Sequence, residues 1–168
     1  MDRSKLVFLD TETTGIGVDG RLCQVAFKFG GEEKMSLFKP PVPIEIEAMS
    51  VTHITNKMVA DKEAFLESQM KKELEEIFSA DNIMVAHNAQ FDAEILKKED
   101  VKIGQMIDTL KIAHHLDRDG ELGRHNLQYL RYFYDLEVED ATAHDALGDI
   151  RVLEKLFDYF FQKMLVEY

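Results

Sequence analysis

The stretch that most constrains this chain is 6–15, which reads L-V-F-L-D-T-E-T-T-G. Four consecutive apolar residues predict a buried strand, which ends in two carboxylates, Asp10 and Glu12, before a turn of small residues that closes on Gly15. Because side chains alternate along a strand, Asp10 and Glu12 project to the same side. Neighbouring ionised carboxylates need a positive partner when buried, and Mg²⁺ and Mn²⁺ prefer hard oxygen ligands. This pair alone leaves two interpretations open, a divalent metal site or two solvated acids at a strand end.

The length and composition favour one folded domain over 1–168. A chain of 168 residues with 45% hydrophobic content can bury a core but is short for two domains. We expect no signal peptide and no membrane association, because no apolar run approaches the length of a membrane span. The single cysteine, Cys23, cannot form an internal disulfide, which favours a packed strand residue in a reducing, cytoplasmic compartment.

The charge limits how the chain could bind a nucleic acid. A net charge of −12 argues against broad coating of a phosphate backbone, for which a basic surface is expected. It leaves room for an enzyme that grips one chain end through cations and a local basic strip. The candidates for such a strip, which could equally be ordinary solvated charges, are Lys97, Lys98, Lys102, Lys111, Arg118, Arg124, His125 and Arg131.

The order of expected elements indicates an α/β fold. A β-meander opens the chain, with strands after the first at Leu22–Phe29 and around 34–38, separated by the turn signal Gly30-Gly31. Later segments predict strands at 82–86 and 106–107 and helices at 61–78, 91–98, 126–134 and 146–165, with further helix starts capped by Thr55 and Thr109. Helices that follow strands require a partly parallel sheet, so we expect a mixed sheet with an antiparallel three-strand opening.

Two further stretches place acids where a strand or loop meets a helix. The first reads M-V-A-H-N-A-Q-F-D and ends at Asp92, which could also be an ordinary acid in a helix's first turn. The second reads A-H-D-A-L-G-D and contains His144 and Asp149. A five-residue step along an α-helix leaves side chains roughly 140° apart, so a shared site requires His144 on the preceding loop or a frayed first turn, with Asp149 on the helix.

Together these stretches resemble the DEDDh exonucleases, the DnaQ-like family. D-T-E-T-T-G, H-N-A-Q-F-D and H-x-x-x-x-D occur here in the family's order, and segments 48–63, 108–113 and 124–130 also resemble family members. The resemblance implies an RNase H-like fold with a five-stranded mixed sheet, and release of 5′-mononucleotides from 3′ ends. It also implies two Mg²⁺ or Mn²⁺ ions in one site, with Asp10, Glu12, Asp92 and Asp149 as metal ligands and His144 as the general base on the attacking water.

The resemblance further implies how the terminal nucleotides are held. Phe91 would stack on the terminal nucleotide and Asn88 would brace the loop. The remaining implied substrate-binding residues are Thr13, Thr14, Gly15, Val51, Thr52, His53 and Ile54. One departure puts contacts in the last segment in doubt, because many family members carry V-H-G-I-T where this chain has V-T-H-I-T. We do not expect His114, His115 or His125 to be ligands, since a hard metal at a carboxylate site does not need them.

The resemblance thus implies a metal-dependent 3′→5′ exonuclease acting on DNA with single-stranded or frayed ends, with a DNA polymerase or repair partner. A 3′→5′ exoribonuclease is the alternative within the same superfamily, because both polymers present the same scissile bond. An alternative of another class is a non-catalytic binding module of a polymerase or helicase assembly.

Overall fold

The computed structural model describes residues 2–138 and 146–167. In this part of the chain five strands form one sheet in the order β3-β2-β1-β4-β5. The strands are β1 Leu6–Thr13, β2 Leu22–Phe29, β3 Glu32–Leu37, β4 Ile83–Ala86 and β5 Gln105–Asp108. β1, β2 and β3 pair antiparallel, whereas β4 runs parallel to both β1 and β5. The predicted five-stranded mixed sheet with an antiparallel opening is therefore confirmed.

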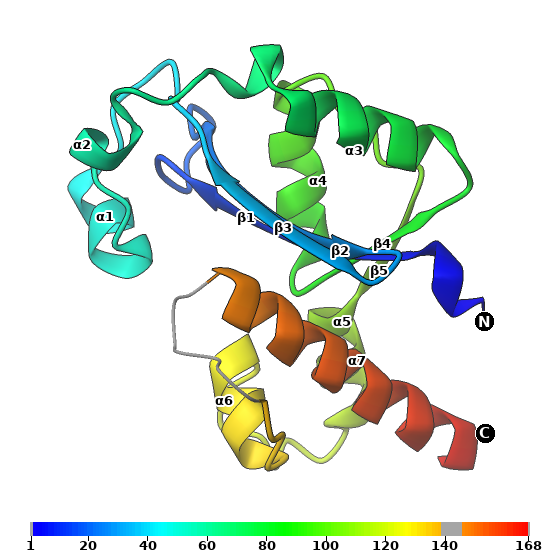
Figure 1. Ribbon diagram of the computed structural model, residues 1–168. Coiled ribbons are helices and arrows are strands. Elements are labelled where there is room, and N and C mark those ends of the chain that lie inside the picture. Colours follow the sequence, from blue (N-terminus) through cyan, green and yellow to red (C-terminus); the bar gives the residue numbers. More distant parts are fainter. Residues whose placement is uncertain (1, 139–145, 168) are drawn as a thin grey trace.

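Helices cover both faces of the sheet (Figure 1). α3 and α4 lie on one face, and α7 crosses the other with α5 and α6 beside it, while α1 and α2 lie beyond one end of the strands. The α-helices of the described residues are α1 Ile46–Thr52, α2 Asn56–Val59, α3 Gln69–Ser79, α4 Ala89–Lys98, α5 Thr109–Leu116, α6 Leu127–Phe133 and α7 Ala146–Glu167. Short 3₁₀ turns, η1 Arg3–Lys5 and η2 Phe65–Glu67, precede β1 and α3. None of the helices in residues 2–138 and 146–167 is both long and apolar enough to cross a bilayer.

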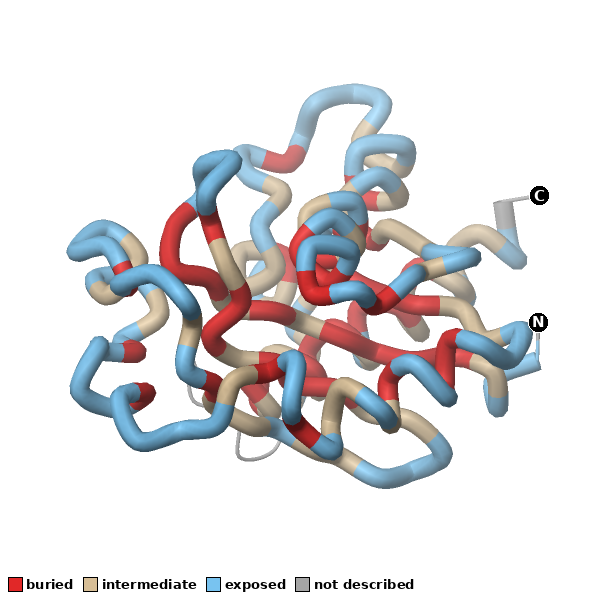
Figure 2. The backbone as a smooth tube through the Cα atoms, turned by 90° about the horizontal axis from the view of Figure 1, so that it is seen from above, coloured by how far each residue is buried: buried red, intermediate tan, exposed pale blue. Residues whose placement is uncertain are grey.

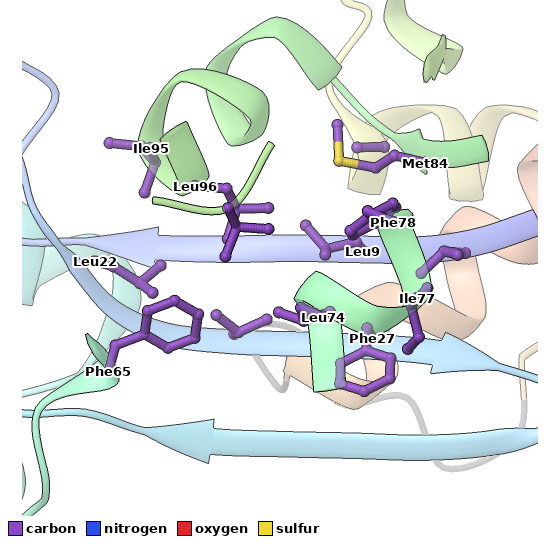
Figure 3. Close-up of a cluster of buried hydrophobic side chains, with 14 of the residues drawn as sticks. Leu9, Leu22, Phe27, Phe65, Leu74, Ile77, Phe78, Met84, Ile95 and Leu96 are labelled. Atoms are coloured by element: carbon purple, nitrogen blue, oxygen red, sulfur yellow. The ribbon is translucent and has the colours of Figure 1, made fainter. Parts of the chain in front are cut away.

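The alternation of β1 divides the core into two layers. Val7 and Leu9 pack with buried side chains of α3 and α4, as the close-up in Figure 3 shows for Leu9. Leu6 and Phe8 point the other way and pack under α7 against Ile150 and its neighbours. The buried segments accordingly gather along the strands and the inner faces of the helices (Figure 2). Asp10 and Glu12 continue the α7 side of this alternation, which brings them to the layer where α7 begins.

Two local expectations differ from the structure. The helix expected at 61–78 is interrupted, because Ser68 is extended and caps α3 by accepting a hydrogen bond from the Lys71 N–H at 3.1 Å. The expected cap Thr109 is instead the first residue of α5, which is capped by Asp108. β1 runs through both acids to Thr13, with a register shift between Glu12 and Thr13 where it pairs with β2. A strand irregularity of this kind re-aims side chains, and it lies beside the predicted site.

Candidate active site

The structure brings the four predicted acids together from three elements. Asp10 and Glu12 lie on β1, Asp92 lies on α4, and Asp149 lies in the first turn of α7. The charges of Asp92, Glu12 and Asp149 all act on Asp10, in that order of strength. We call Asp10, Glu12, Asp92 and Asp149 the acid cluster. Asp149 is placed by its neighbours, since Ala146 and Ile150 pack against the β1 face that carries Asp10.

Asp92 is the most buried residue of the acid cluster. Asp92 is 3% exposed, and its Oδ1 accepts hydrogen bonds from the backbone N–H of Thr11 at 3.0 Å and from the Thr11 hydroxyl at 2.7 Å. Thr11 thus faces α4 while its neighbours on β1 face α7. Because side chains alternate along β1, its end contacts Asp92 of α4 through Thr11 and faces Asp149 of α7 through Asp10 and Glu12.

Burial and mutual repulsion dominate the electrostatics of the acid cluster. Burial raises the pKa of Asp10 well above its usual value, and the charges of the other three acids raise it further. Burial, with the charge of Asp149, raises the pKa of Glu12 to about 7. Burial also raises the pKa of Asp92 to about 7, although the hydrogen bonds from Thr11 oppose this shift. Acids that destabilise one another's charged forms call for a positive partner.

The chemistry of this donor set fits a hard divalent cation. Carboxylate oxygens are the ligands that Mg²⁺ and Mn²⁺ prefer, and a cation would stabilise the charged forms of Asp10, Glu12 and Asp92, whose pKa values burial raises. Within the described residues, however, no group of three or more His, Cys, Asp or Glu side chains is arranged to hold an ion as it stands. Asp92 is turned toward Thr11, and Asp149 accepts a hydrogen bond from the side-chain amide of Gln128. Metal binding would therefore require Asp92 to turn away from Thr11.

A pocket of about 310 Å³ opens beside the acid cluster. We call it the α1 pocket, because α1 forms one wall opposite β1. Its lining residues are Glu12, Thr13, Gly15, Ile16, Glu45, Glu47, Ala48, Val51, Thr52 and Phe91. It thus brings together five of the predicted substrate-binding residues, namely Thr13, Gly15, Val51, Thr52 and Phe91. The pocket also contains four residues that the sequence analysis did not single out, Ile16, Glu45, Glu47 and Ala48. Only Ile16 carried a sequence signal for a binding surface, because it is an apolar residue in a polar turn, and it is 92% exposed.

The other three predicted substrate-binding residues lie outside this pocket. Thr14 is 2% exposed, and its carbonyl accepts a hydrogen bond from the Glu45 N–H at 2.8 Å, which ties β1 to the start of α1. His53 ends α1 in the left-handed conformation, with φ at 58°. Ile54 is 3% exposed and packs with Cys23, Ile44 and Val59. The Ile54 side chain therefore faces the core and packs beneath the pocket wall, and its contact with a substrate stays a prediction.

Part of the predicted basic strip has a structural role. The Lys98 ammonium donates to the carbonyls of Val18 and Gly20, at 2.8 and 2.9 Å, and so holds the loop between β1 and β2. Arg21, at the end of that loop, pairs in a bidentate manner with the buried carboxylate of Glu99. These contacts fix the loop that carries Gly15 and Ile16 into the α1 pocket.

Backbone and ring contacts hold the stretch before Asp92. Asn88 is left-handed, with φ at 76°, and its N–H donates to the Asp108 carboxylate at 3.0 Å. The ring of His87 lies 2.9 Å from the Thr109 hydroxyl through Nδ1 and 2.7 Å from the His125 carbonyl through Nε2. Burial lowers the pKa of His87, which favours a neutral ring that donates from Nε2 and accepts at Nδ1. His125 pairs with Asp117, and His114 stacks on His125, so both have structural partners. His144 lies outside the described residues.

Comparison with known proteins places the chain in a family. A family model described as exonuclease, of the RNase T type, matches residues 7–157. The chain belongs to this exonuclease family. The DNA polymerase III epsilon subunit of Buchnera aphidicola is 32% identical over 183 residues, which cover 94% of this chain and 73% of that subunit. The PolC-type DNA polymerase III of Caldanaerobacter subterraneus is 31% identical over 170 residues, so that this exonuclease spans only 12% of that much longer protein.

Solved structures agree with this assignment. Exonuclease X, solved in complex with 5′ overhanging duplex DNA, superposes with a TM-score of 0.71 at 26% identity, covering 94% of this chain and 92% of that one. A structure of exonuclease I matches with the same TM-score at 20% identity and shows the shared fold. The predicted membership of the DnaQ-like exonucleases and the RNase H-like fold are therefore confirmed.

Proposed function

We propose that this exonuclease removes 5′-mononucleotides from single-stranded or frayed 3′ ends of DNA, using two Mg²⁺ or Mn²⁺ ions held by the acid cluster. The observation that carries the proposal is the convergence of four acids from β1, α4 and α7 in a chain of the exonuclease family. The DNA complex of exonuclease X and the polymerase relatives support DNA as the polymer. The same relatives support a DNA polymerase or repair complex as the partner.

The residues of the chain would share the chemistry as follows. His144 takes a proton from the attacking water, since an imidazole can accept one near neutral pH. The water oxygen bonds to phosphorus while the bond to the preceding nucleotide's 3′ oxygen breaks, which leaves the phosphate on the released nucleotide. Two bound cations would neutralise the acid cluster and stabilise the attacking and leaving oxygens.

The α1 pocket would hold the terminal nucleotide without reading its base. Phe91 offers an aromatic face, and Ile16 and Val51 are exposed apolar side chains at the rim. Stacking of a base on an aromatic ring is worth about 1–3 kcal/mol and tolerates any base. The acidic rim residues Glu45 and Glu47 make the pocket unsuited to a phosphate and leave it to the base or sugar.

A paired degradation assay tests the proposal. Labelled single-stranded DNA and RNA oligonucleotides, each unblocked, 3′-blocked or 5′-blocked, are incubated with Mg²⁺, Mn²⁺ or EDTA. We expect metal-dependent release of mononucleotides from unblocked and 5′-blocked DNA, and none from 3′-blocked DNA. Faster turnover of RNA would make the chain an exoribonuclease. Cleavage of neither polymer with any divalent metal would leave a binding module.

The role of His144 has its own test. The change His144→Ala should lower turnover roughly 10²- to 10⁴-fold, because general base catalysis is lost. Oligonucleotide binding and metal binding should remain, since neither uses the imidazole. His114→Ala, which removes an exposed histidine of α5, is the matched control and should leave turnover unchanged. If His144→Ala turns over substrate about as fast as the parent protein, at saturating metal and neutral pH, then His144 is not the general base.

A further inference from the structure

Gln128 is held beside the acid cluster by the packing of α6. The helix begins beside the first turns of α7 (Figure 1), and its cap Asn126 accepts a hydrogen bond from the Tyr129 N–H at 2.9 Å. Leu127 and Leu130, on either side of Gln128, pack into hydrophobic clusters shared with α7. The backbone of Gln128 is therefore fixed, and its side chain reaches Asp149 across 21 positions of sequence.

In the Gln128 side-chain amide, Nε2 has a hydrogen-bond partner among the described residues and Oε1 has none. Its Nε2 donates a hydrogen bond to Oδ1 of Asp149. The orientation of the amide follows from this contact, because an ionised carboxylate only accepts hydrogen bonds and must face the N–H group. The carbonyl Oε1 then points away, and it is buried without a hydrogen-bond partner among the described residues.

A buried carbonyl without a donor needs an explanation, since such groups are rare in native proteins. In the metal-loaded protein the acid cluster cannot supply the donor, because carboxylates that bind a cation are ionised, and ionised carboxylates accept hydrogen bonds and do not donate them. A water molecule on a divalent cation donates strongly, since the cation polarises its O–H bonds. A donor of this class would be absent from the metal-free protein and present in the loaded one.

We propose that Gln128 is a positioning residue of the metal centre, whose amide N–H orients the Asp149 carboxylate and whose carbonyl accepts a hydrogen bond from a water ligand of the cation. This inference rests on the proposed function, because it requires the acid cluster to bind a metal. Partners of this kind, one contact removed from the metal, fix the ligand's orientation, and removing them typically weakens metal binding or activity about 10- to 100-fold.

The test uses Gln128→Leu and Gln128→Met, which keep much of the side-chain volume and lose both the donor and the carbonyl. Gln90→Leu is the matched control, because the Gln90 amide also donates to a carboxylate, that of Glu94 at 2.9 Å, but on an exposed face of α4. Three quantities are measured for each protein: the Mn²⁺ dissociation constant by calorimetry, the unfolding midpoint in EDTA, and kcat and KM on single-stranded DNA.

We expect both Gln128 variants to bind Mn²⁺ about 10- to 100-fold more weakly. At saturating metal kcat should fall while KM changes little, and the midpoint in EDTA should be unchanged or higher because a buried orphaned carbonyl is gone. Gln90→Leu should match the parent protein in all three quantities. Gln128 variants that bind Mn²⁺ as tightly as the parent, or that lose stability in EDTA without losing metal affinity, would overturn the inference. A parent protein that neither binds Mn²⁺ nor degrades DNA would overturn the proposed function itself.

Discussion

At the scale of single residues, Asp10 is the position where charge works against folding. Its pKa is raised by burial and by three neighbouring acids, so the metal-free protein holds a carboxylate whose charged form is disfavoured. Asp117 is the opposite case, since the Leu122 N–H and His125 lower its pKa and stabilise its charged form. The two acids therefore predict opposite responses to removal of the charge.

We predict that Asp10→Asn leaves the metal-free protein as stable as the parent or more so, because repulsion within the acid cluster is relieved. In the parent, Mg²⁺ or Mn²⁺ should add about 2.7 kcal/mol of stability when free metal is about a hundred times its dissociation constant, and the variant should lose most of this gain. Asp117→Asn, the control, should destabilise the protein with or without metal. Thermal melts in EDTA and across a metal titration give both quantities. A less stable metal-free Asp10→Asn protein with a full metal-induced gain would contradict the prediction.

His87 predicts how stability depends on pH. Burial lowers its pKa in the folded protein below the ordinary value of 6.5, so the unfolded chain takes up a proton more readily than the folded one. The contribution of the neutral His87 ring to the free energy of unfolding is therefore complete above pH 6.5. It is lost as the pH falls from 6.5 toward the lower pKa of His87 in the folded protein. The difference in unfolding free energy between the parent and His87→Gln should shrink between pH 7.5 and 5.5, as measured by urea titrations. Parallel pH curves for the two proteins would show that His87 does not titrate in this way.

At the scale of elements, the loop between β1 and β2 positions one wall of the α1 pocket. A Cβ added at Gly20 would collide with the backbone carbonyl of Gly15, whereas one added at Gly17 would meet nothing within 4 Å. Because Gly15 lines the α1 pocket, a shift of this backbone would carry over to the pocket. The loop is held from outside by Lys98 and cannot simply move away.

We predict that Gly20→Ala costs about 1–3 kcal/mol of stability, as overpacking against fixed backbone usually does. It should also raise KM for single-stranded DNA, because the pocket wall is displaced. Gly17→Ala is the matched control and should change neither quantity. Urea denaturation and steady-state kinetics provide the measurements. Equal stability and equal KM in the two variants would show that the loop yields freely.

At the scale of the whole molecule, the net charge of −12 limits how much nucleic-acid backbone the protein can grip. Several cations are also engaged within the fold, such as Arg21 with Glu99, Lys28 with Glu154, and Arg151 with Glu33. Affinity should then come from the metal centre and the α1 pocket, and few counterions should be released on binding. We predict a shallow salt dependence, with a slope of log affinity against log salt of about −0.7 to −2 for single strands, as one to three phosphate contacts would give. Fluorescence anisotropy of a catalytically inactive variant measures it, and a slope steeper than about −4 would point to an extended basic surface instead.

Features set by short stretches of sequence could be predicted, whereas contacts between distant elements could not. Short-range patterns were reliable guides, since the alternation of Leu6 to Glu12 follows from strand geometry and the apolar spacing of α7 from helix geometry. The motifs also predict the elements that carry the four acids, the first strand and two helices, because each motif lies where local patterns mark a strand end or a helix start. The sequence does not predict the break at Ser68, because the serine that caps α3 and the 3₁₀ turn with buried Phe65 lie inside one continuous helical pattern.

The sequence by itself thus determined the strand that carries Asp10 and Glu12, the helices that follow the sheet strands, and the family of the chain. Only the tertiary structure decided that Ile54 faces the core, that Glu45 and Ala48 join the α1 pocket, and that Gln128 touches Asp149. The physical reason is range. Periodicity reports which face of an element is buried, whereas a contact between α6 and α7, or between α1 and β1, depends on how whole elements pack, and no local pattern encodes that packing.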